Sequence, residues 1–448
     1  MQNLHATEKK KADILLLNGL VLTLDDNSSR FDPGGVAVRS NRIEAVGPSP
    51  LIESGFDAVR TIDISGCVVL PGLINSHTHA AMTLFRGLAD DLPLMDWLQK
   101  YIFPAEAHLT GDLVYWGTML ACAEMILSGT TTFCDMYLFE QKTAEAAKNA
   151  GIRALVGEVL YDFPSPSYGS VENAIPHTES LIERWRDDSL IRIAVEPHAL
   201  YTCSPELLKK CNETALRNEV PLIIHLSEND AEVRQVVEKF GRRPVQHLAN
   251  LGILGPGLIA DHCVALDQND SALLAENDVK VVHNPESNMK LASGIAPVPR
   301  LLDLGITVAL GTDGCASNNN LDMFGEMDTC AKLHKAAALD PTVASAATVL
   351  KMATANGADA LGWSGKIGRI APGMLADLIV VDFAKPHLTP LYNPVSHLVY
   401  AAGPADVRHS IINGNLVMED RRLLTLDLEE IFGHVREFAK IAGKIVHA

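Results

Sequence analysis

The feature that most constrains this fold is a regular alternation of short apolar or β-branched runs with longer helix-like stretches, between residues 67 and 311. The helix-like stretches include residues 111–127, 204–217 and 231–248. The strand-like runs occupy residues 67–74, 130–136, 153–160, 191–197, 220–226, 258–262, 279–283 and 306–311. This alternation predicts an α/β fold, a (β/α)8 TIM-type barrel. A doubly wound sheet is the structural alternative, but no G-x-G-x-x-G motif follows the first run.

The two chain ends share a different pattern, in which short apolar runs flank a turn. Asn18-Gly19 separates two such runs near the start, and Asn413-Gly414 separates two near the other end. Because Asn-Gly suits a two-residue hairpin turn, both pairs predict β-hairpins. We therefore predict one small β-sandwich domain made from both ends, with a C-terminal helix. The predicted division is residues 1–67 with 368–448 for the small domain, 428–446 for its helix, and 68–367 for the barrel.

Composition excludes several classes of partner. The 37 basic and 55 acidic residues give a net charge of −18, so the basic surface that binds a phosphate backbone is lacking. Anionic membranes are disfavoured for the same reason, and no apolar run reaches the roughly 18 residues of a membrane span. The 8 cysteines form no C-x-x-C pair, which is typical of a reducing compartment. We therefore predict a cytoplasmic protein that binds neither nucleic acid nor membrane.

Polar side chains that can bind metal follow five of the expected strands. In a barrel, the carboxyl ends of the strands meet at one face, so these groups are expected in a common mouth. The segments are Asn75-Ser-His-Thr-His79, Glu196-Pro-His198, Ile224-His-Leu-Ser-Glu228, Ala260-Asp-His262 and Gly311-Thr-Asp-Gly314.

Four of these side chains predict a single metal site. His77 and His79 are two residues apart on a strand and therefore face the same side. His225 and Asp313 complete a set of nitrogen and oxygen ligands that suits zinc, with iron and manganese as alternatives. Any one of these residues is more simply a structural histidine or a turn aspartate. The prediction rests on all four falling at strand ends.

Three further residues are expected beside the metal. Glu228 can move protons without binding the ion, His262 can polarise a bound water, and His198 can contact substrate. Their simpler interpretations are a solvated loop glutamate, a buried histidine and a strand cap. Since a bound metal lowers the pKa of water to about 7, the set suits hydrolysis at an sp² carbon.

At this point the residues resemble a known family. Pro71-Gly-Leu-Ile-Asn-Ser-His-Thr-His79, His283-Asn-Pro-Glu-Ser-Asn288 and Gly311-Thr-Asp-Gly314 are similar to motifs of the amidohydrolase superfamily, over nearly the whole chain. Loop segments 83–92, Trp97-Leu98 and Phe103-Pro-Ala-Glu106 resemble the 5′-methylthioadenosine/S-adenosylhomocysteine deaminases within it. The barrel does not need these loop residues for its construction, so the second likeness is specific.

The resemblance implies a role for each residue. The ligands of one divalent ion per subunit would be His77, His79, His225 and Asp313. Glu228 would protonate the purine ring nitrogen N1, while His262 and Asp313 hold the hydroxide that attacks C6. Ammonia then leaves, and the product is the inosine analogue. The implied substrate contacts are Glu106 at the ribose hydroxyls, Trp97 as an aromatic wall near the 5′ substituent, and His198, Glu228 and Asp313.

One position departs from the family pattern and bears on specificity. Some members present an arginine after the third strand, suited to the homocysteine carboxylate, whereas this chain has Glu158 there. We therefore expect 5′-methylthioadenosine to be preferred over S-adenosylhomocysteine, with adenosine and 5′-deoxyadenosine as further substrates. A homo-oligomer is implied by the resemblance alone.

Other activities stay open at this stage. The nearest alternatives are a triazine-type chlorohydrolase and a guanine- or pterin-type deaminase on the same scaffold. Glu228 and Glu106 argue against the chlorohydrolase, which needs neither ring protonation nor ribose recognition. A two-metal cyclic-imide hydrolase would need a bridging lysine after the fourth strand, where Glu196-Pro-His198 supplies none. A non-catalytic assembly protein on the same fold is the remote alternative.

Overall fold

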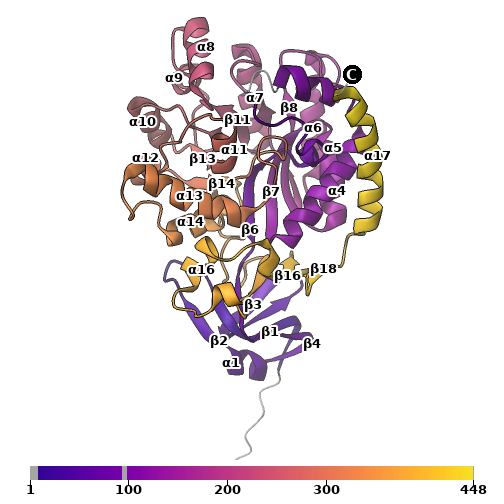
Figure 1. Ribbon diagram of the computed structural model, residues 1–448, viewed down its shortest axis with the longest axis vertical. Helices are drawn as coiled ribbons and strands as arrows, with labels where there is room; N and C mark the ends of the chain where they lie inside the picture. Colours follow the sequence, from indigo (N-terminus) through magenta and orange to yellow (C-terminus); the bar gives the residue numbers. More distant parts are fainter. Residues whose placement is uncertain (1–8, 93–97, 447–448) are drawn as a thin grey trace, which may run out of the picture.

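The computed structural model describes residues 9–92 and 98–446, and they form a mixed α/β structure (Figure 1). Two parallel sheets form its larger part. The first has the order β10-β8-β7-β6, with β9 also paired to β8, and the second has the order β11-β12-β13-β14. The strands are β6 (Leu73–Thr78), β7 (Thr130–Tyr137), β8 (Arg153–Leu160), β9 (Ile191–Ile193), β10 (Glu196–Pro197), β11 (Leu222–Leu226), β12 (Leu258–His262), β13 (Lys280–His283) and β14 (Val308–Leu310).

Backbone contacts join the two parallel sheets at both flanks. On one flank, isolated parallel bridges pair Val195 with Leu222 and Ala199 with His225. On the other, the N–H of Asp313, just after β14, donates to the carbonyl of His77 in β6 at 2.9 Å. The carboxyl ends of all these parallel strands therefore open on the same side of the molecule.

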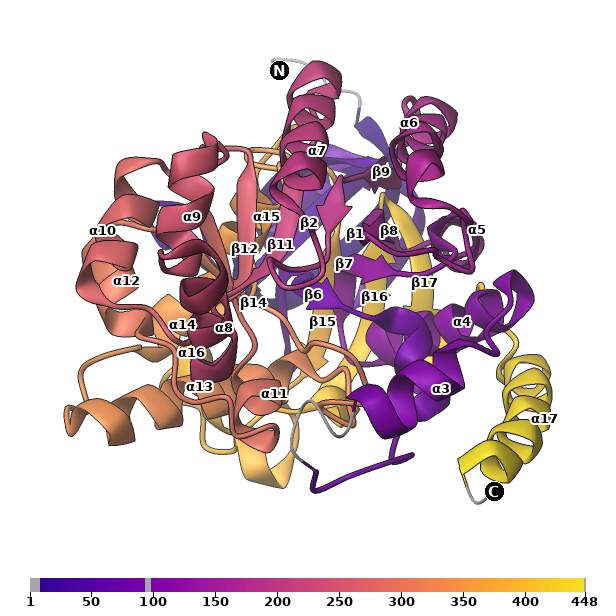
Figure 2. The same cartoon turned by 90° about the horizontal axis from the view of Figure 1, so that it is seen from above.

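The helices lie around the parallel strands, as the view from above shows (Figure 2). The predicted helix 111–127 is confirmed as α4 (Gly111–Leu127), and 204–217 corresponds to α7 (Pro205–Asn218). The predicted helix 231–248 is wrong as a single element, because it divides into α8 (Asp230–Phe240) and α9 (Pro244–Leu251). Gly241, with φ at +68°, ends α8, and Pro244 begins α9. Other helices of this region are α3 (Phe103–Glu106), α5 (Glu140–Ala150), α6 (Ala174–Trp185), α10 (Gln268–Glu276), α11 (Pro285–Lys290), α12 (Val298–Asp303), α13 (Met323–Ala338), α14 (Ala346–Met352) and α15 (Ala355–Ala360).

Both chain ends contribute to one nine-stranded sheet, in the order β18-β17-β16-β15-β5-β1-β2-β3 with β4 paired to β1. Its strands β1 to β4 lie below the parallel strands in Figure 1. They are β1 (Lys10–Leu22), β2 (Arg30–Arg39), β3 (Arg42–Pro48) and β4 (Phe56–Asp63), joined by β5 (Cys67–Pro71), β15 (Leu378–Asp382), β16 (Val407–Ile412), β17 (Asn415–Glu419) and β18 (Arg422–Leu423). The Asn413-Gly414 hairpin is confirmed, since it joins β16 to β17.

Two predictions about strands are wrong. Asn18 does not begin a hairpin turn; it lies within the continuous strand β1, with φ at +71° and a shift of register beside it. The expected first barrel strand, residues 67–74, divides into β5 and β6, which belong to different sheets. Pro71 lacks an N–H for a sheet ladder, and a Cβ at Gly72 would collide with Thr131. The chain therefore crosses from one sheet to the other at this point.

The predicted C-terminal helix is present as α17 (Leu428–Val446), and it runs beside α4 in Figure 1. His434 stacks on Trp116 of α4 with ring centroids 3.9 Å apart, and Phe438 packs 6.0 Å from Phe85. The helix thus packs on the parallel-strand region, although its place in the sequence groups it with the small β domain. No helix in the described ranges is long and apolar enough to cross a membrane.

Candidate functional site

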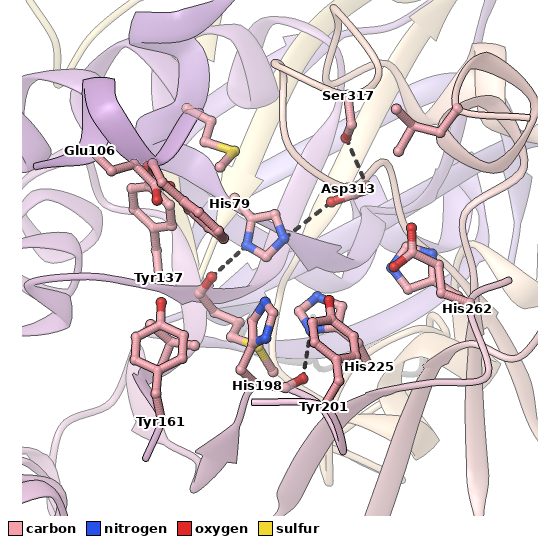
Figure 3. A pocket seen from close by; sticks show the side chains of 16 residues that line it. His79, Glu106, Tyr137, Tyr161, His198, Tyr201, His225, His262, Asp313 and Ser317 are labelled. Atoms are coloured by element: carbon pink, nitrogen blue, oxygen red, sulfur yellow. Dashed lines mark hydrogen bonds and ion pairs between the residues drawn. The ribbon is translucent and has the colours of Figure 1, made fainter. Parts of the chain in front are cut away.

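A cavity opens at the carboxyl ends of the parallel strands, and most of the predicted site residues line it (Figure 3). His79, His198, His225 and His262 each lie at or just beyond the end of a strand, as the sequence predicted. The lining residues are His79, Met82, Phe103, Glu106, Met136, Tyr137, Val159, Tyr161, His198, Tyr201, His225, Glu228, His262, Leu291, Asp313 and Ser317.

The four predicted metal ligands converge at the base of this cavity. One nitrogen each from His77, His79 and His225 lies within 4.8 Å of the other two. Asp313 Oδ1 lies 3.2 Å from His79 Nε2 and 3.6 Å from His77 Nε2. His77 Nε2 is buried and has no hydrogen-bond partner in the described ranges. A buried nitrogen without a partner, facing a carboxylate and two further imidazoles, fits a divalent metal ion.

Each of the three histidines is held through its Nδ1 atom. His77 Nδ1 lies 3.1 Å from Asp261 Oδ2, and His225 Nδ1 lies 2.8 Å from the carbonyl of His198. His79 Nδ1 hydrogen-bonds the carbonyl of Met136. Such partners fix the tautomer and the ring orientation of a ligating histidine and leave Nε2 for the metal.

Asp313 is oriented by hydroxyls and by its own loop. Ser287 and Ser317 donate to its Oδ2 at 2.6 and 2.9 Å, and the N–H of Gly314 donates to its Oδ1 at 2.7 Å. Burial alone raises the pKa of Asp313, but the hydrogen bond and charge of His79 outweigh it and hold this pKa well below its usual range. The side chain is therefore a carboxylate aimed at the three histidines.

Glu228 lines the cavity without belonging to the histidine cluster. Its backbone N–H donates to Glu232 Oε2 at 2.7 Å, and that of Ser227 donates to Glu232 Oε1 at 3.1 Å. Ser227 has a left-handed φ of +52°, so these two bonds hold a strained turn in place. Burial raises the pKa of Glu228, against the opposing effect of nearby His262. A carboxyl group in these surroundings can hold a proton nearer to neutral pH than an exposed glutamate can.

His262 and His198 lie on two sides of the histidine cluster (Figure 3). His262 Nδ1 lies 2.9 Å from Asn288 Oδ1, which leaves its Nε2 for the cavity. Burial lowers the pKa of His262, but the charges of Glu228 and Asp313 outweigh it and raise it overall. Burial lowers the pKa of His198 to about 3, so this imidazole is neutral at pH 7.

Glu106 approaches the cavity from α3, on the far side of His79 from His262 in Figure 3. Its Oε1 accepts a hydrogen bond of 2.7 Å from the hydroxyl of Tyr137, and burial raises its pKa to about 7. Trp97 lies outside the described residues, so its predicted place at the 5′ end stays a prediction.

The prediction that Glu158 meets the substrate is wrong. Its side chain is fully buried and is not among the residues that line the cavity. It accepts hydrogen bonds of 3.1 and 3.0 Å from the backbone N–H groups of Phe139 and Glu140, and it pairs with His177 at 3.3 Å. Because side chains alternate along a strand, Val159 faces the cavity and Glu158 faces the start of α5.

Sequence reasoning missed the residues that support the site. Asp261 and Asn288 lie in sequence motifs that were singled out for other residues of the same motifs. Both could have been predicted as supporting residues, because short polar side chains beside a metal ligand often hydrogen-bond it. Tyr161, Tyr201 and Phe103 line the cavity without any such signal. Only the fold brings these three rings together.

Comparison with known proteins agrees with this geometry. The model of the amidohydrolase family matches residues 68–417. A relative from Syntrophobacter fumaroxidans, named 5-methylthioadenosine/S-adenosylhomocysteine deaminase, is 71% identical over 96% of this chain and 98% of its own. A 5′-deoxyadenosine deaminase from Methanosarcina mazei is 46% identical over 97% and 99%. The crystal structure of an adenosine deaminase from Xanthomonas campestris with bound zinc has a TM-score of 0.96 and 39% identity, covering 98% of this chain and 100% of that one.

Proposed function

Because the chain belongs to the amidohydrolase family, we propose that it is a hydrolytic deaminase that converts 5′-methylthioadenosine to its inosine analogue and ammonia. Adenosine, 5′-deoxyadenosine and S-adenosylhomocysteine are the further substrates of the proposal. The observation that supports it is that the Glu228 carboxyl group lines the cavity together with His79, His225 and Asp313 without belonging to the histidine cluster. The names of the close relatives support the same substrate class.

The proposed ligands of one divalent ion are His77, His79, His225 and Asp313. Zinc suits this set of nitrogen and oxygen donors, and iron and manganese are the alternatives. When bound, such an ion supplies a water activated for attack at neutral pH. Asp261 serves this set by holding His77 through Nδ1.

Side chains of the cavity carry out the proton transfers in the proposed deamination. Glu228, with its raised pKa, delivers a proton to purine N1 as the water oxygen attacks C6. His262, oriented by Asn288, hydrogen-bonds the attacking water through Nε2 and is the proposed orienting base. The water gives up both of its protons, one to replace the proton that Glu228 passed to N1 and one to the amino group. The C6–N bond then breaks, ammonia leaves, and C6 keeps the water oxygen as a carbonyl. Neutral His198 contacts the substrate without competing for these protons.

The cavity walls support a nucleoside with an apolar 5′ group. Glu106 offers carboxylate oxygens to the ribose hydroxyls, and the hydroxyl of Tyr137 holds the carboxyl group through Oε1. Phe103, Tyr161 and Tyr201 add ring surface to the lining. No lysine or arginine is among the described residues that line this cavity, and Lys290 of the adjoining cavity is paired with Asp90, which disfavours a homocysteine carboxylate. This replaces the reasoning from Glu158, and it ranks 5′-methylthioadenosine first.

The scaffold and its surroundings complete the proposal. We infer that the parallel strands close into a (β/α)8 barrel, which the bridges at Val195 and Ala199 and the bond from Asp313 to His77 support. The proposed division is residues 68–367 for this barrel domain and residues 1–67 with 368–448 for the small β domain, with α17 packed against the barrel domain. All eight cysteines are free thiols, which supports a reducing cytoplasm. A homo-oligomer stays a prediction, to be checked by light scattering.

An ultraviolet time course with the zinc-loaded protein tests the proposed function. Adenine and hypoxanthine chromophores absorb differently, and the released ammonia is measured in parallel. We expect 5′-methylthioadenosine to be converted faster than S-adenosylhomocysteine. No conversion of any adenosine by a protein with a filled metal site would contradict the proposal, and turnover of guanine, a pterin or a triazine would favour the corresponding alternative.

A further inference from the structure

A second group of metal-binding side chains lies between β13 and α13, outside the cavity. His283 ends β13, and Cys330 and His334 are four residues apart, on one face of α13. One potential ligand atom from each of the three lies within 4.8 Å of the other two. All three side chains are buried, none with more than 1% of its surface exposed.

The buried polar atoms of this cluster form few hydrogen bonds. His283 Nε2 and His334 Nε2 face each other at 3.0 Å and share one hydrogen bond. His283 Nδ1 has no hydrogen-bond partner in the described ranges. Within the same ranges no hydrogen bond reaches the Cys330 thiol. Buried polar groups are normally paired, so three converging side chains that leave one ring nitrogen and one thiol without a hydrogen bond favour a site for a ligand.

We propose that His283, Cys330 and His334 bind a second divalent metal ion, separate from the ion in the cavity. Two imidazole nitrogens and one thiolate are a donor set that favours zinc, which takes tetrahedral sites of this kind. Three protein ligands leave one position for a small fourth ligand such as water. The proposal concerns a different site and does not depend on the deaminase function.

The protonation states of the three groups are compatible with such a site. Burial lowers the pKa of His334 to about 4 and holds that of His283 well below its usual range, so both imidazoles are neutral. Burial raises the pKa of the Cys330 thiol. Binding therefore replaces the thiol proton with the metal–sulfur bond, and the proton goes to solvent.

The position of the cluster suggests a structural role for its ion. β13 leads directly into α11, which carries Ser287 and Asn288. Those two residues hold Asp313 and His262 in the cavity. An ion that ties His283 to α13 would fix the strand from which this supporting helix leaves.

Titration of the metal-free full-length protein with cobalt(II) tests the proposal, because only a thiolate ligand gives an intense sulfur-to-cobalt charge-transfer band in the near ultraviolet. The ligand set of the cavity contains no sulfur, so the band reports on the second cluster alone. We expect two equivalents of cobalt per chain and a charge-transfer band that grows with one of them. One equivalent without this band would overturn the proposal.

Two variants and a matched control locate the second ion. Cys330→Ser should lose the band and one equivalent of cobalt while keeping the other, and His334→Gln should lose the same equivalent. Cys211→Ser, which alters another buried cysteine in α7, should keep both equivalents and the band. A band that persists in Cys330→Ser would place the thiolate elsewhere and overturn the proposal. Deamination by the wild-type protein is measured separately, so failure of the second site leaves the proposed function standing.

Discussion

The amino end of β8 and the carboxyl ends of the parallel strands differ in how their buried charged groups are paired. At the amino end, Arg153 forms hydrogen bonds of 2.7 and 3.1 Å to both carboxylate oxygens of Asp377, and a third of 2.8 Å to the carbonyl of Ser189. Both charged side chains are only 1% exposed. The pair ties the parallel strands to the segment that enters β15 of the nine-stranded sheet.

At the carboxyl ends of the parallel strands, buried polar groups lack such hydrogen bonds. His77 Nε2 and both carboxylate oxygens of Asp261 lack hydrogen bonds in the described ranges, although His77 Nδ1 and Asp261 Oδ2 form an ion pair. Ser227, His262 and Asp313 all have left-handed backbone there. Unsatisfied atoms and strain persist in a folded protein only where the surroundings impose them, and they gather at functional sites. The comparison teaches that the buried pair at the amino end of β8 is arranged for stability and the carboxyl ends of the strands for chemistry.

The largest effect is expected from Glu228→Gln at the carboxyl end. The amide cannot deliver a proton to N1, so kcat should fall by about 10²–10⁴-fold while the metal stays bound. Steady-state kinetics with metal analysis measures this. The control is Glu238→Gln, which changes an exposed glutamate on α8, the helix that follows Glu228. This variant should behave as wild type. Near-normal turnover in metal-replete Glu228→Gln would refute the proton-transfer role.

The matching change at the amino end is Arg153→Met, which leaves the buried Asp377 carboxylate without its cation. Removing one partner of a buried pair costs about 3–5 kcal/mol in free energy of unfolding, whereas kcat of the remaining folded protein should be unchanged. Chemical denaturation measures the first quantity. Arg186→Met, which removes an exposed pair with Glu183, should cost less than about 1 kcal/mol. A large loss of kcat in Arg153→Met would contradict the claim that the amino end serves stability and the carboxyl end serves catalysis.

Glu232→Ala sharpens the comparison, because it removes support from the active end without touching the proposed substrate. Losing the two bonds to Ser227 and Glu228 at about 1–1.5 kcal/mol each predicts a decrease in kcat of roughly 30- to 160-fold, with metal content retained. Glu232→Gln keeps one carbonyl acceptor, so its kcat should lie between those of the wild type and Glu232→Ala. If KM rises and kcat does not, the carboxylate acts in binding and the positioning role is wrong.

The smallest effect is a pH dependence of KM that comes from Glu106. Its pKa of about 7 means that the carboxylate becomes protonated as the pH falls through neutrality. A charged acceptor binds a hydroxyl more strongly than a neutral one by about 1 kcal/mol, so KM should rise roughly fivefold below pH 7. KM measured at several pH values checks this, with Glu106→Gln as the control that should show no such rise. A flat profile in the wild type would remove Glu106 from ribose recognition.

Much of the fold could be predicted because it rests on periodic burial. The runs that became β7, β8, β11 and β12 are rich in apolar or β-branched residues, and the strand ends carry the predicted site residues, such as His225 in β11 and His262 in β12. The division at Pro71-Gly72 could not be predicted from apolar periodicity, since it depends on contact between Gly72 and Thr131, far away in the chain.

The site was predictable only in part, for a related reason. His77, His79, His225 and Asp313 carry their own chemical signal at strand ends. Glu158 carries the same kind of signal, yet one step of strand alternation turns it to the other face, toward the start of α5. The sequence places it correctly at a strand but does not reveal which side it faces without an exact register.

Product analysis in ¹⁸O-labelled water tests the central claim most directly. Zinc-loaded protein is incubated with 5′-methylthioadenosine, and the nucleoside is analysed by mass spectrometry while ammonia is measured. We predict that each ammonia released is matched by one 5′-methylthioinosine that carries one solvent oxygen at C6. Release of free adenine, or an unchanged nucleoside from protein with a filled metal site, would contradict the account.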